Sequence, residues 1–462
     1  MSSYRLHPSI LREYDIRGIV GETLTADCAF HIGRAFGTYV CRRGGKTIVV
    51  SRDGRESSPI LERSLIQGLI QTGLHITHIE MGPTPLVLFA QQHFNCDASI
   101  MVTASHNPPS YNGFKMALGD YYLYGQDIKA LGETVGRADY EKDEGEIMEA
   151  TVEEAYIAYL LADFHSHYSQ GRPLKIAWDA SNGSAGHILE HLVASLPGEH
   201  ILLNSTIDGS FPAHPPDPSH AENLEQLQQC VRDRQCDLGI AFDGDGDRLG
   251  VVDEKGEILW GDHLILLFAK EVLSKNPGST IIGDIKVSQV TFEAIQSSGG
   301  KPLMWRTGRS LIKSKMLETQ SPFAGEMSGH IFFADRYYGY DDALYAALRL
   351  VGSRMLDGEP LSNFRKQIPS VFNTPELRFS CAEEQKSLIV HRIAEQLRKR
   401  GIPFTDLDGI RTLYNDGWWL LRASNTTNDL VARIEAKTLE SLNELREELF
   451  GYLEENGICT EG

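Results

Sequence analysis

The stretch Asp243-Gly244-Asp245-Gly246-Asp247-Arg248 places three carboxylates on alternate residues, separated only by glycines. Two like charges about 4 Å apart repel by roughly 4 kcal/mol at an effective dielectric of about 20, so an empty loop of this kind is costly. A hard divalent cation removes that cost, and an all-oxygen ligand set suits Mg²⁺ or Ca²⁺ better than zinc. We therefore expect a metal-binding loop at 243–248, with glycines that let the backbone fold around the ion.

Two short apolar runs, 238–242 and 249–252, flank this loop and are typical of strands. An EF-hand is one alternative for acids at this spacing, but it requires a helix on each side and a glycine where Arg248 stands. A solvated acidic turn is the other alternative, and the strict alternation with glycine disfavours it. The flanks predict a strand, a metal loop and a second strand.

The composition is that of an ordinary soluble globular protein, with 41% hydrophobic and 23% charged residues. A length of 462 residues suggests about three or four domains. The formal net charge of −19 argues against nucleic acid or an anionic membrane as the main partner. An anionic small substrate stays possible, because local basic groups can outweigh the average field.

The cysteines and the N-terminal segment indicate a cytoplasmic protein. The seven cysteines include no C-x-x-C pair, which fits reduced thiols better than a disulfide or zinc framework. The N-terminal segment lacks the apolar stretch of a signal peptide, and no apolar run approaches the roughly 18 residues of a membrane helix.

One order of events occurs three times along the chain: a strand, a helix, further strands and then a polar loop. The opening strands are expected at 46–50, 175–178 and 279–283, with Asp53, Asp179 and Asp284 at or just after their ends. The later strands at 96–102, 236–242 and 321–324 lead into loops at 103–107, 243–248 and 325–330. A glycine with a nearby acid follows each loop, at Gly125 and Asp127, Gly261 and Asp262, and Gly339 and Asp341. We expect three similar mixed α/β units whose loops face one central cleft.

The last part of the chain has a different pattern. A linker-like run at 369–375 precedes a strand, a helix over 384–400, a hairpin through 418–421 and 430–434, and a helix over 439–455. This order predicts a small C-terminal α+β domain. The predicted domains are therefore 1–150, 151–252, 253–367 and 368–462. The hairpin turn at 422–427 offers a guanidinium, hydroxyls and an amide, which suit phosphate, although such residues also fill ordinary turns.

Ser105 lies in a polar loop directly after an apolar strand, with His106 and Asn107 beside it. A serine hydroxyl is a poor nucleophile unless a base or metal activates it, or unless it carries a covalent phosphate. No acyl-transfer triad is evident in the sequence. The metal loop and the arginines favour phosphoryl transfer, in which positioning and charge neutralisation provide most of the catalysis.

Four segments, 103–108, 243–248, 325–330 and 422–427, occur in the order seen in the α-D-phosphohexomutase superfamily, and this resemblance spans nearly the whole chain. The Glu326–His330 loop resembles that of the bacterial phosphomannomutase/phosphoglucomutase branch. The resemblance implies an intramolecular phosphotransferase that interconverts the 1- and 6-phosphates of mannose, glucose or both. It also implies a phosphoserine, Mg²⁺, and a hexose 1,6-bisphosphate as intermediate and activator.

The resemblance also implies roles for individual residues. Ser105 would be the phosphoserine and would hold Mg²⁺ together with Asp243, Asp245 and Asp247. The expected charge stabilisers and acid/base candidates around the transferring group are Arg17, Lys115, Arg248 and His330. The expected substrate-binding residues are Tyr14, Lys286, Gly308, Arg309, Glu326, Ser328, His330, Arg422, Ser424, Asn425 and Thr426.

Two positions depart from the family pattern, and some alternatives stay open. Arg309 stands where histidine is usual, which bears on the sugar preference, and Asn428 stands where proline is common. A phosphoglucosamine mutase would typically carry glutamine in place of Met327. A mutase specific for glucose and a non-catalytic sugar-phosphate-binding protein are further alternatives, although the latter could lack Ser105 or an aspartate. The oligomeric state, the resting phosphorylation of Ser105 and the proton carrier are left open.

One further motif, His187-Ile188-Leu189-Glu190-His191, matches the H-x-x-E-H zinc pattern. It falls on the helix expected after the second opening strand. We interpret it as part of a helix surface rather than as a zinc protease site.

Overall fold

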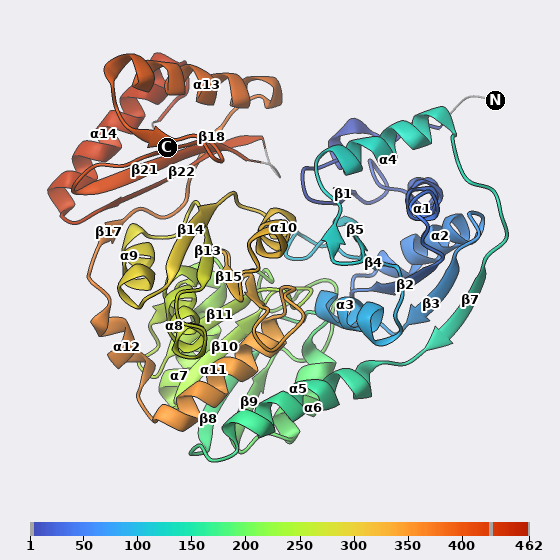
Figure 1. Cartoon of the computed structure of the whole chain (residues 1–462), viewed down its shortest axis with the longest axis horizontal. Helices are drawn as coiled ribbons and strands as arrows, with labels where there is room; N and C mark the ends of the chain where they lie inside the picture. The colour runs from blue at the N-terminus through green and yellow to red at the C-terminus, as the bar shows by residue number, and fades with distance from the viewer. Residues whose placement is uncertain (1–3, 425–427, 461–462) are drawn as a thin grey trace.

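The computed structural model describes residues 4–424 and 428–460. Four sheets follow one another along the chain, and each belongs to a separate unit (Figure 1). The first unit, in blue, and the last, in red, lie on opposite sides of the view, and the second and third units connect them. The three mixed α/β units and the C-terminal α+β unit expected from the sequence are confirmed.

The first unit has a seven-stranded sheet in the order β1-β5-β4-β2-β3-β7, with β6 paired to β5. Its strands are β1 (Ile16–Ile19), β2 (Thr47–Arg52), β3 (His75–Ile79), β4 (Ala98–Val102), β5 (Tyr111–Leu118), β6 (Tyr121–Tyr122) and β7 (Glu146–Ala150). Its helices are η1 (Pro8–Ile10), α1 (Ala26–Cys41), α2 (Ser58–Ile70), α3 (Thr84–His93) and α4 (Gln126–Arg137). Strand β4 is buried along its whole length, as expected for a central strand covered on both faces.

The second unit has a five-stranded sheet in the order β12-β11-β10-β8-β9, and the third has four strands in the order β14-β13-β15-β16. The elements of the second unit are α5 (Glu153–Tyr168), β8 (Leu174–Asp179), α6 (Gly186–Ala194), β9 (Gly198–Leu203), η2 (Ala221–Leu224), α7 (Glu225–Arg234), β10 (Leu238–Phe242), β11 (Leu249–Asp253) and β12 (Ile258–Leu259). Those of the third are α8 (Gly261–Lys275), β13 (Thr280–Asp284), α9 (Gln289–Ser297), β14 (Lys301–Trp305), α10 (Arg309–Thr319), β15 (Phe323–Gly325), β16 (Ile331–Phe333), α11 (Ala343–Asp357) and α12 (Leu361–Gln367).

The three units share one pairing pattern. In each, the opening strand pairs in parallel with two neighbours: β2 with β3 and β4, β8 with β9 and β10, and β13 with β14 and β15. The second neighbour then pairs antiparallel with the strand that follows it, as β4 does with β5, β10 with β11, and β15 with β16. Each polar loop singled out in the sequence joins this antiparallel pair. The three loops therefore occupy equivalent places, which confirms the internal triplication.

The C-terminal unit has a six-stranded sheet in the order β17-β22-β21-β20-β19, with β18 paired to β22. Its elements are β17 (Phe372–Asn373), β18 (Leu377–Ser380), α13 (Glu383–Arg400), β19 (Phe404–Thr405), β20 (Ile410–Thr412), β21 (Gly417–Ala423), β22 (Asp429–Ala436) and α14 (Leu439–Glu455). Gly401 ends α13 in the left-handed conformation that favours glycine, as the sequence predicts.

The hydrophobic cores divide the molecule unequally. One core contains Met101 of the first unit, Trp178 of the second and Phe268 of the third, whereas Trp419 belongs to a separate core of the C-terminal unit. A small cluster of Ile285, Trp418 and Leu420 joins that unit to the third. Within residues 4–424 and 428–460, no helix is long and apolar enough to cross a membrane.

Candidate active site

The loop between β4 and β5 holds Ser105 buried and in a constrained conformation. Its φ of +51° is uncommon outside glycine and indicates a backbone held by its surroundings. Arg55, itself buried, donates to the carbonyl oxygens of Ser105 at 2.7 Å and of Asn107 at 2.6 Å. Asp53, at the end of β2, accepts from Arg55 Nε at 3.1 Å and from the Thr103 hydroxyl at 2.7 Å. The sequence marked Asp53 only as a strand end and gave no sign of the role of Arg55.

The aspartate loop between β10 and β11 lies directly against Ser105. The Ser105 hydroxyl donates to Asp243 Oδ2 at 2.7 Å. Asp243, Asp245 and Asp247 are fully buried, and one carboxylate oxygen from each lies within 4.8 Å of the others. Burial, with repulsion from Asp247 and Asp245, raises the pKa of Asp243 well above its ordinary value. The strand flanks confirm the strand–loop–strand prediction against the EF-hand.

The donor set of this loop fits a hard cation. Asp245 Oδ1 and Asp247 Oδ1 are buried and have no hydrogen-bond partner among the residues that the structure describes. Unpaired buried carboxylate oxygens are costly, and Mg²⁺ prefers oxygen ligands of this kind. The protein therefore contains a buried acidic group that can hold a metal ion.

Lys115, expected beside the transferring group, contacts the metal loop. Its ammonium donates to Asp245 Oδ2 at 2.6 Å and to Asp247 Oδ2 at 2.5 Å. One positive charge offsets part of the repulsion between these two carboxylates, and the Oδ1 atom of each still has no hydrogen-bond partner within residues 4–424 and 428–460. A contact between Lys115 and a transferring phosphoryl group stays a prediction.

Arg248 and His330 meet across two loops of different units. Arg248 Nε donates to His330 Nε2 at 3.0 Å, which assigns the ring proton of a neutral His330 to Nδ1. That nitrogen lies 2.9 Å from Asp341 Oδ2. Asp341 carried a signal in the sequence, because a glycine and a nearby acid follow each of the three loops.

Arg309 also binds Asp341. Its Nε lies 2.7 Å from Asp341 Oδ2 and its second terminal nitrogen donates to Oδ1 at 3.0 Å. The same Nε is 3.6 Å from Asp247, and the guanidinium lies over the Tyr122 ring at 4.4 Å. The side chain is only 12% exposed, so Arg309 joins the sugar loop to the metal loop. Its role in sugar binding stays a prediction.

The sugar loop at 307–308 is held from two other sides. The Tyr14 hydroxyl of the first unit donates to the Thr307 carbonyl at 2.6 Å. Glu326 accepts from the Gly308 amide, and burial raises the pKa of this glutamate. Gly308 has a φ of +126°, and a Cβ there would lie 2.5 Å from the Tyr14 ring. A side chain at 308 would therefore be strained and would push Tyr14 away.

Arg422, expected to bind phosphate, and Lys286, expected to contact the sugar, each lie near a carboxylate. Arg422 pairs with Asp408 at 3.1 Å, and Asp408 also accepts from the Thr307 amide at 3.1 Å. Lys286 Nζ lies 3.7 Å from a Glu376 oxygen. The sequence did not indicate Asp408, which is 101 residues from Thr307, or Glu376, which lies far along the chain from Lys286.

The remaining expected residues are placed only in part. Arg17 is buried, pairs with Asp15 at 2.5 Å and donates to the Asn107 side chain. Ser424 is buried and Ser328 is half-buried. Asn425 and Thr426 lie outside the described residues.

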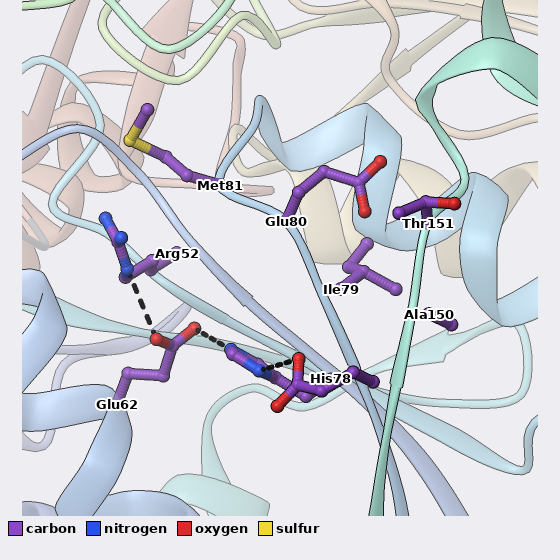
Figure 2. Close-up of a pocket in the computed structure, with 9 residues that line it drawn as sticks. Arg52, Glu62, His78, Ile79, Glu80, Met81, Ala150 and Thr151 are labelled. Carbon is purple, nitrogen blue, oxygen red and sulfur yellow. Dashed lines mark hydrogen bonds and ion pairs between the residues drawn. The ribbon is translucent and has the colours of Figure 1, made fainter.

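A separate pocket of about 490 Å³ lies beside β3 and β7 in the first unit (Figure 2). His78 lies between Glu62, at 3.1 Å, and Glu149, at 2.7 Å, and Arg52 pairs with Glu62 at 3.2 Å. Hydrogen bonding to Glu62 raises the pKa of His78. None of the expected site residues that the structure describes lines this pocket, and its charged network links α2 to β2, β3 and β7.

Comparison with known proteins supports the resemblance to phosphohexomutases. The chain matches the four domain families described as phosphoglucomutase/phosphomannomutase α/β/α domains I, II and III and C-terminal domain, over 8–139, 154–256, 260–372 and 376–451. It is 42% identical to a phosphomannomutase/phosphoglucomutase of Pseudomonas aeruginosa, covering 96% of this chain and 94% of that one. It is 39% identical to a phosphoglucomutase of Neisseria gonorrhoeae, covering 97% of each.

A crystal structure of a phosphoglucomutase/phosphomannomutase family protein from Burkholderia thailandensis matches with a TM-score of 0.90 and 40% identity, covering 97% of each chain. The fold and the serine and aspartate loops thus define an enzyme of the α-D-phosphohexomutase superfamily. Within it, the chain belongs to the phosphoglucomutase/phosphomannomutase family.

Proposed function

We propose that this enzyme interconverts the 1- and 6-phosphates of mannose, glucose or both through a phosphoserine and a hexose 1,6-bisphosphate. The observation that supports this most directly is the Ser105 hydroxyl, 2.7 Å from Asp243 in a buried triple-aspartate loop. The same bisphosphate would serve as activator by phosphorylating Ser105.

In the proposed reaction, the phosphorus–oxygen bond to Ser105 breaks as a bond forms to the free hydroxyl of the sugar monophosphate. A nearby base accepts the proton of that hydroxyl. The resulting bisphosphate then reorients in the site and returns its other phosphoryl group to Ser105. Ser105, Asp243, Asp245 and Asp247 would hold Mg²⁺, which when bound neutralises charge on the phosphoryl oxygens. Phosphorylation of Ser105 would remove the hydroxyl proton that now bonds Asp243.

Four cationic or titratable side chains are suited to the transferring group: Arg17, Lys115, Arg248 and His330. His330 is the acid/base candidate with the clearest geometry, because the contacts of Arg248 and Asp341 orient its ring. Nε2 accepts from Arg248, so His330 could take a proton there only after Arg248 turns toward the phosphoryl group. Movement of Arg248 toward the phosphoryl group would then make Nε2 of His330 available for proton transfer.

The substrate would span from this site to the C-terminal unit. We assign the phosphoserine loop to residues 1–150, the metal loop to 151–252, the sugar loop to 253–367 and the non-transferring phosphate to 368–462. Glu326 and Ser328 would bind the sugar 3- and 4-hydroxyls, and Tyr14, Lys286, Gly308 and Arg309 would line the same space. Arg422, Ser424, Asn425 and Thr426 would bind phosphate, whose charge would replace that of Asp408 on Arg422.

We further propose a cytoplasmic enzyme with a small phosphosugar as its ligand, and with neither nucleic acid nor membrane as a partner. The net charge of −19 supports this, since it disfavours polyanionic partners, while the local cations retain affinity for a phosphosugar.

The test is turnover of glucose, mannose and glucosamine 1-phosphates with Mg²⁺ and glucose 1,6-bisphosphate. We expect conversion of the glucose or mannose substrate, or of both, and little turnover of glucosamine 1-phosphate. Preferred turnover of glucosamine 1-phosphate would support a phosphoglucosamine mutase. Binding of all three sugars without turnover would support the non-catalytic alternative.

A further inference from the structure

The strongest feature outside the proposed active site is a group of two histidines and one glutamate on the second unit. His187 and His191 lie four residues apart on α6, and their rings are 4.7 Å apart. Glu153, the first residue of α5, brings a carboxylate to the same place from a different helix. The three potential ligand atoms lie within 4.8 Å of one another.

The contacts converge on one oxygen. Glu153 Oε1 lies 2.8 Å from His187 Nδ1 and 4.0 Å from His191 Nε2. A tetrahedral zinc site with bonds of about 2.0 to 2.1 Å has ligand atoms about 3.3 Å apart. The contact between Glu153 and His187 would therefore have to lengthen by about half an ångström, and that between Glu153 and His191 would have to shorten by a slightly larger amount. Small rotamer changes of the two exposed histidines can supply these shifts.

Glu153 is held in place from the first unit. Glu80 Oε1 accepts from the backbone amides of Val152 at 2.9 Å and of Glu153 at 2.8 Å. These bonds fix the first turn of α5 beside α6, and the two helices lie next to each other in the structure (Figure 1). The carboxylate is therefore presented from an anchored backbone, and its side chain is only 18% exposed.

We propose that Glu153, His187 and His191 form a Zn²⁺-binding site, with water in the fourth position. Two imidazoles and one carboxylate suit zinc, whereas Mg²⁺ prefers oxygen ligands alone. The H-x-x-E-H pattern is thus a metal ligand pair, but it is not a zinc protease site. Glu190, the residue that would act as base in such an enzyme, accepts from the Ser205 hydroxyl at 2.8 Å. Zinc at this place would link the start of α5 to α6.

The test is calorimetric titration of Zn²⁺ into the full chain and three variants. The double variant His187→Ala, His191→Ala removes both imidazoles. His165→Ala, His167→Ala is the matched control, because these exposed histidines of α5 are two residues apart and face different directions. Zn²⁺ can also enter the aspartate loop, but that loop is intact in all these proteins. The difference in bound Zn²⁺ between the wild type and the double variant therefore reports on the histidine site alone.

We expect the wild type and the control to bind about one more Zn²⁺ per chain than the double variant. Glu153→Gln should weaken this site by at least roughly 10- to 100-fold, the loss usual for an outer-shell partner. Equal stoichiometry and affinity in the wild type and the double variant would overturn the proposal, as would an equal loss in the control. The site is independent of the proposed reaction, and the double variant should keep wild-type mutase turnover with Mg²⁺.

Discussion

The two ends of the proposed active site, the transfer end at Ser105 and Asp243 and the holding end at Arg422, are built from opposite charges. At the transfer end three carboxylates are buried together, Lys115 pairs with two of them, and two of their oxygens have no hydrogen-bond partner among the described residues. At the holding end the paired contacts are between a basic residue and a carboxylate, as in Arg422 with Asp408. The transfer end therefore requires a further cation, whereas the holding end requires an anion able to displace a carboxylate.

The two ends also differ in how they are supported. Ser105 and the aspartate loop lie on units joined by a common hydrophobic core, and the first unit has a second core of its own. The C-terminal unit has its own core and contacts the third unit through the small cluster of Ile285, Trp418 and Leu420 and through Arg411 and Arg433. Arg411 donates to the carbonyls of Ile285 at 2.6 Å and Val287 at 2.9 Å, and Arg433 donates to that of Lys286 at 2.7 Å. The holding end thus depends on a small contact between units that is partly apolar and partly polar.

The largest expected effect is loss of the cation at the transfer end. We expect chelation by EDTA to lower turnover of glucose 1-phosphate by more than about 10³-fold, because repulsion among the aspartates would be uncompensated. Added Mg²⁺ should restore it. Asp245→Asn should lose at least about 10²-fold, whereas the exposed control Asp233→Asn should stay close to wild type. Full activity in metal-free buffer would contradict this part of the account.

Loss of the Arg422 guanidinium at the holding end should weaken the binding of phosphosugar. Arg422→Ala should weaken binding of glucose 6-phosphate by roughly 10- to 150-fold, because a charge-assisted bond to phosphate contributes about 1.5 to 3 kcal/mol. Calorimetry measures this directly. The matched control is Arg398→Ala, whose exposed side chain pairs with Glu395. Unchanged affinity in Arg422→Ala would remove this loop from the site.

The variant Arg309→His tests whether Arg309 acts at the transfer end of the proposed active site. The sequence predicts a substrate-binding role for it in the sugar loop, and its bonds to Asp341 also bring it beside His330 at the transfer end. We therefore expect Arg309→His to lower kcat/KM for mannose and glucose 1-phosphates alike, by about threefold to thirtyfold. A changed ratio between the two sugars, with kcat retained, would indicate that Arg309 acts in sugar recognition alone.

Most of the fold was predictable from the sequence because the pattern is repeated three times. The apolar runs around Asp243 and before Ser105 became the strands expected, and the C-terminal helices begin and end within about one residue of prediction. The domain boundaries at 150, 252 and 367 stay predictions.

The contacts between units were not predictable. Ser105 and the aspartates are contiguous motifs, so their residue types carry the signal. Asp408 and Arg55 act through partners about 100 and 50 residues away, respectively, and single acids or arginines in a loop give no local pattern. The partner of Arg309 likewise depends on how α10 meets the segment at Asp341, which packing determines.

The smallest effect is expected at His78, which belongs to neither end. Its pKa is raised in the folded protein, chiefly by hydrogen bonding to Glu62, so the charged form is stabilised. That contribution is fully present below about pH 6.5 and is lost as the pH rises through the raised value. His78→Gln should therefore lower Tm more at pH 5.5 than at pH 8.5. The corresponding loss in the free energy of unfolding should be about 1 kcal/mol or less, and turnover should be unchanged. An equal loss of Tm at both pH values would contradict this assignment.

The central claim is that Ser105 carries the transferred phosphoryl group. Protein incubated with glucose 1,6-bisphosphate and Mg²⁺ should gain about 80 Da by intact-mass analysis, and peptide analysis should place the phosphate on Ser105. Glucose 6-phosphate should then discharge it, and Ser105→Ala should neither gain the mass nor turn over substrate. Wild-type turnover by Ser105→Ala, or phosphate found only on another residue, would contradict the account.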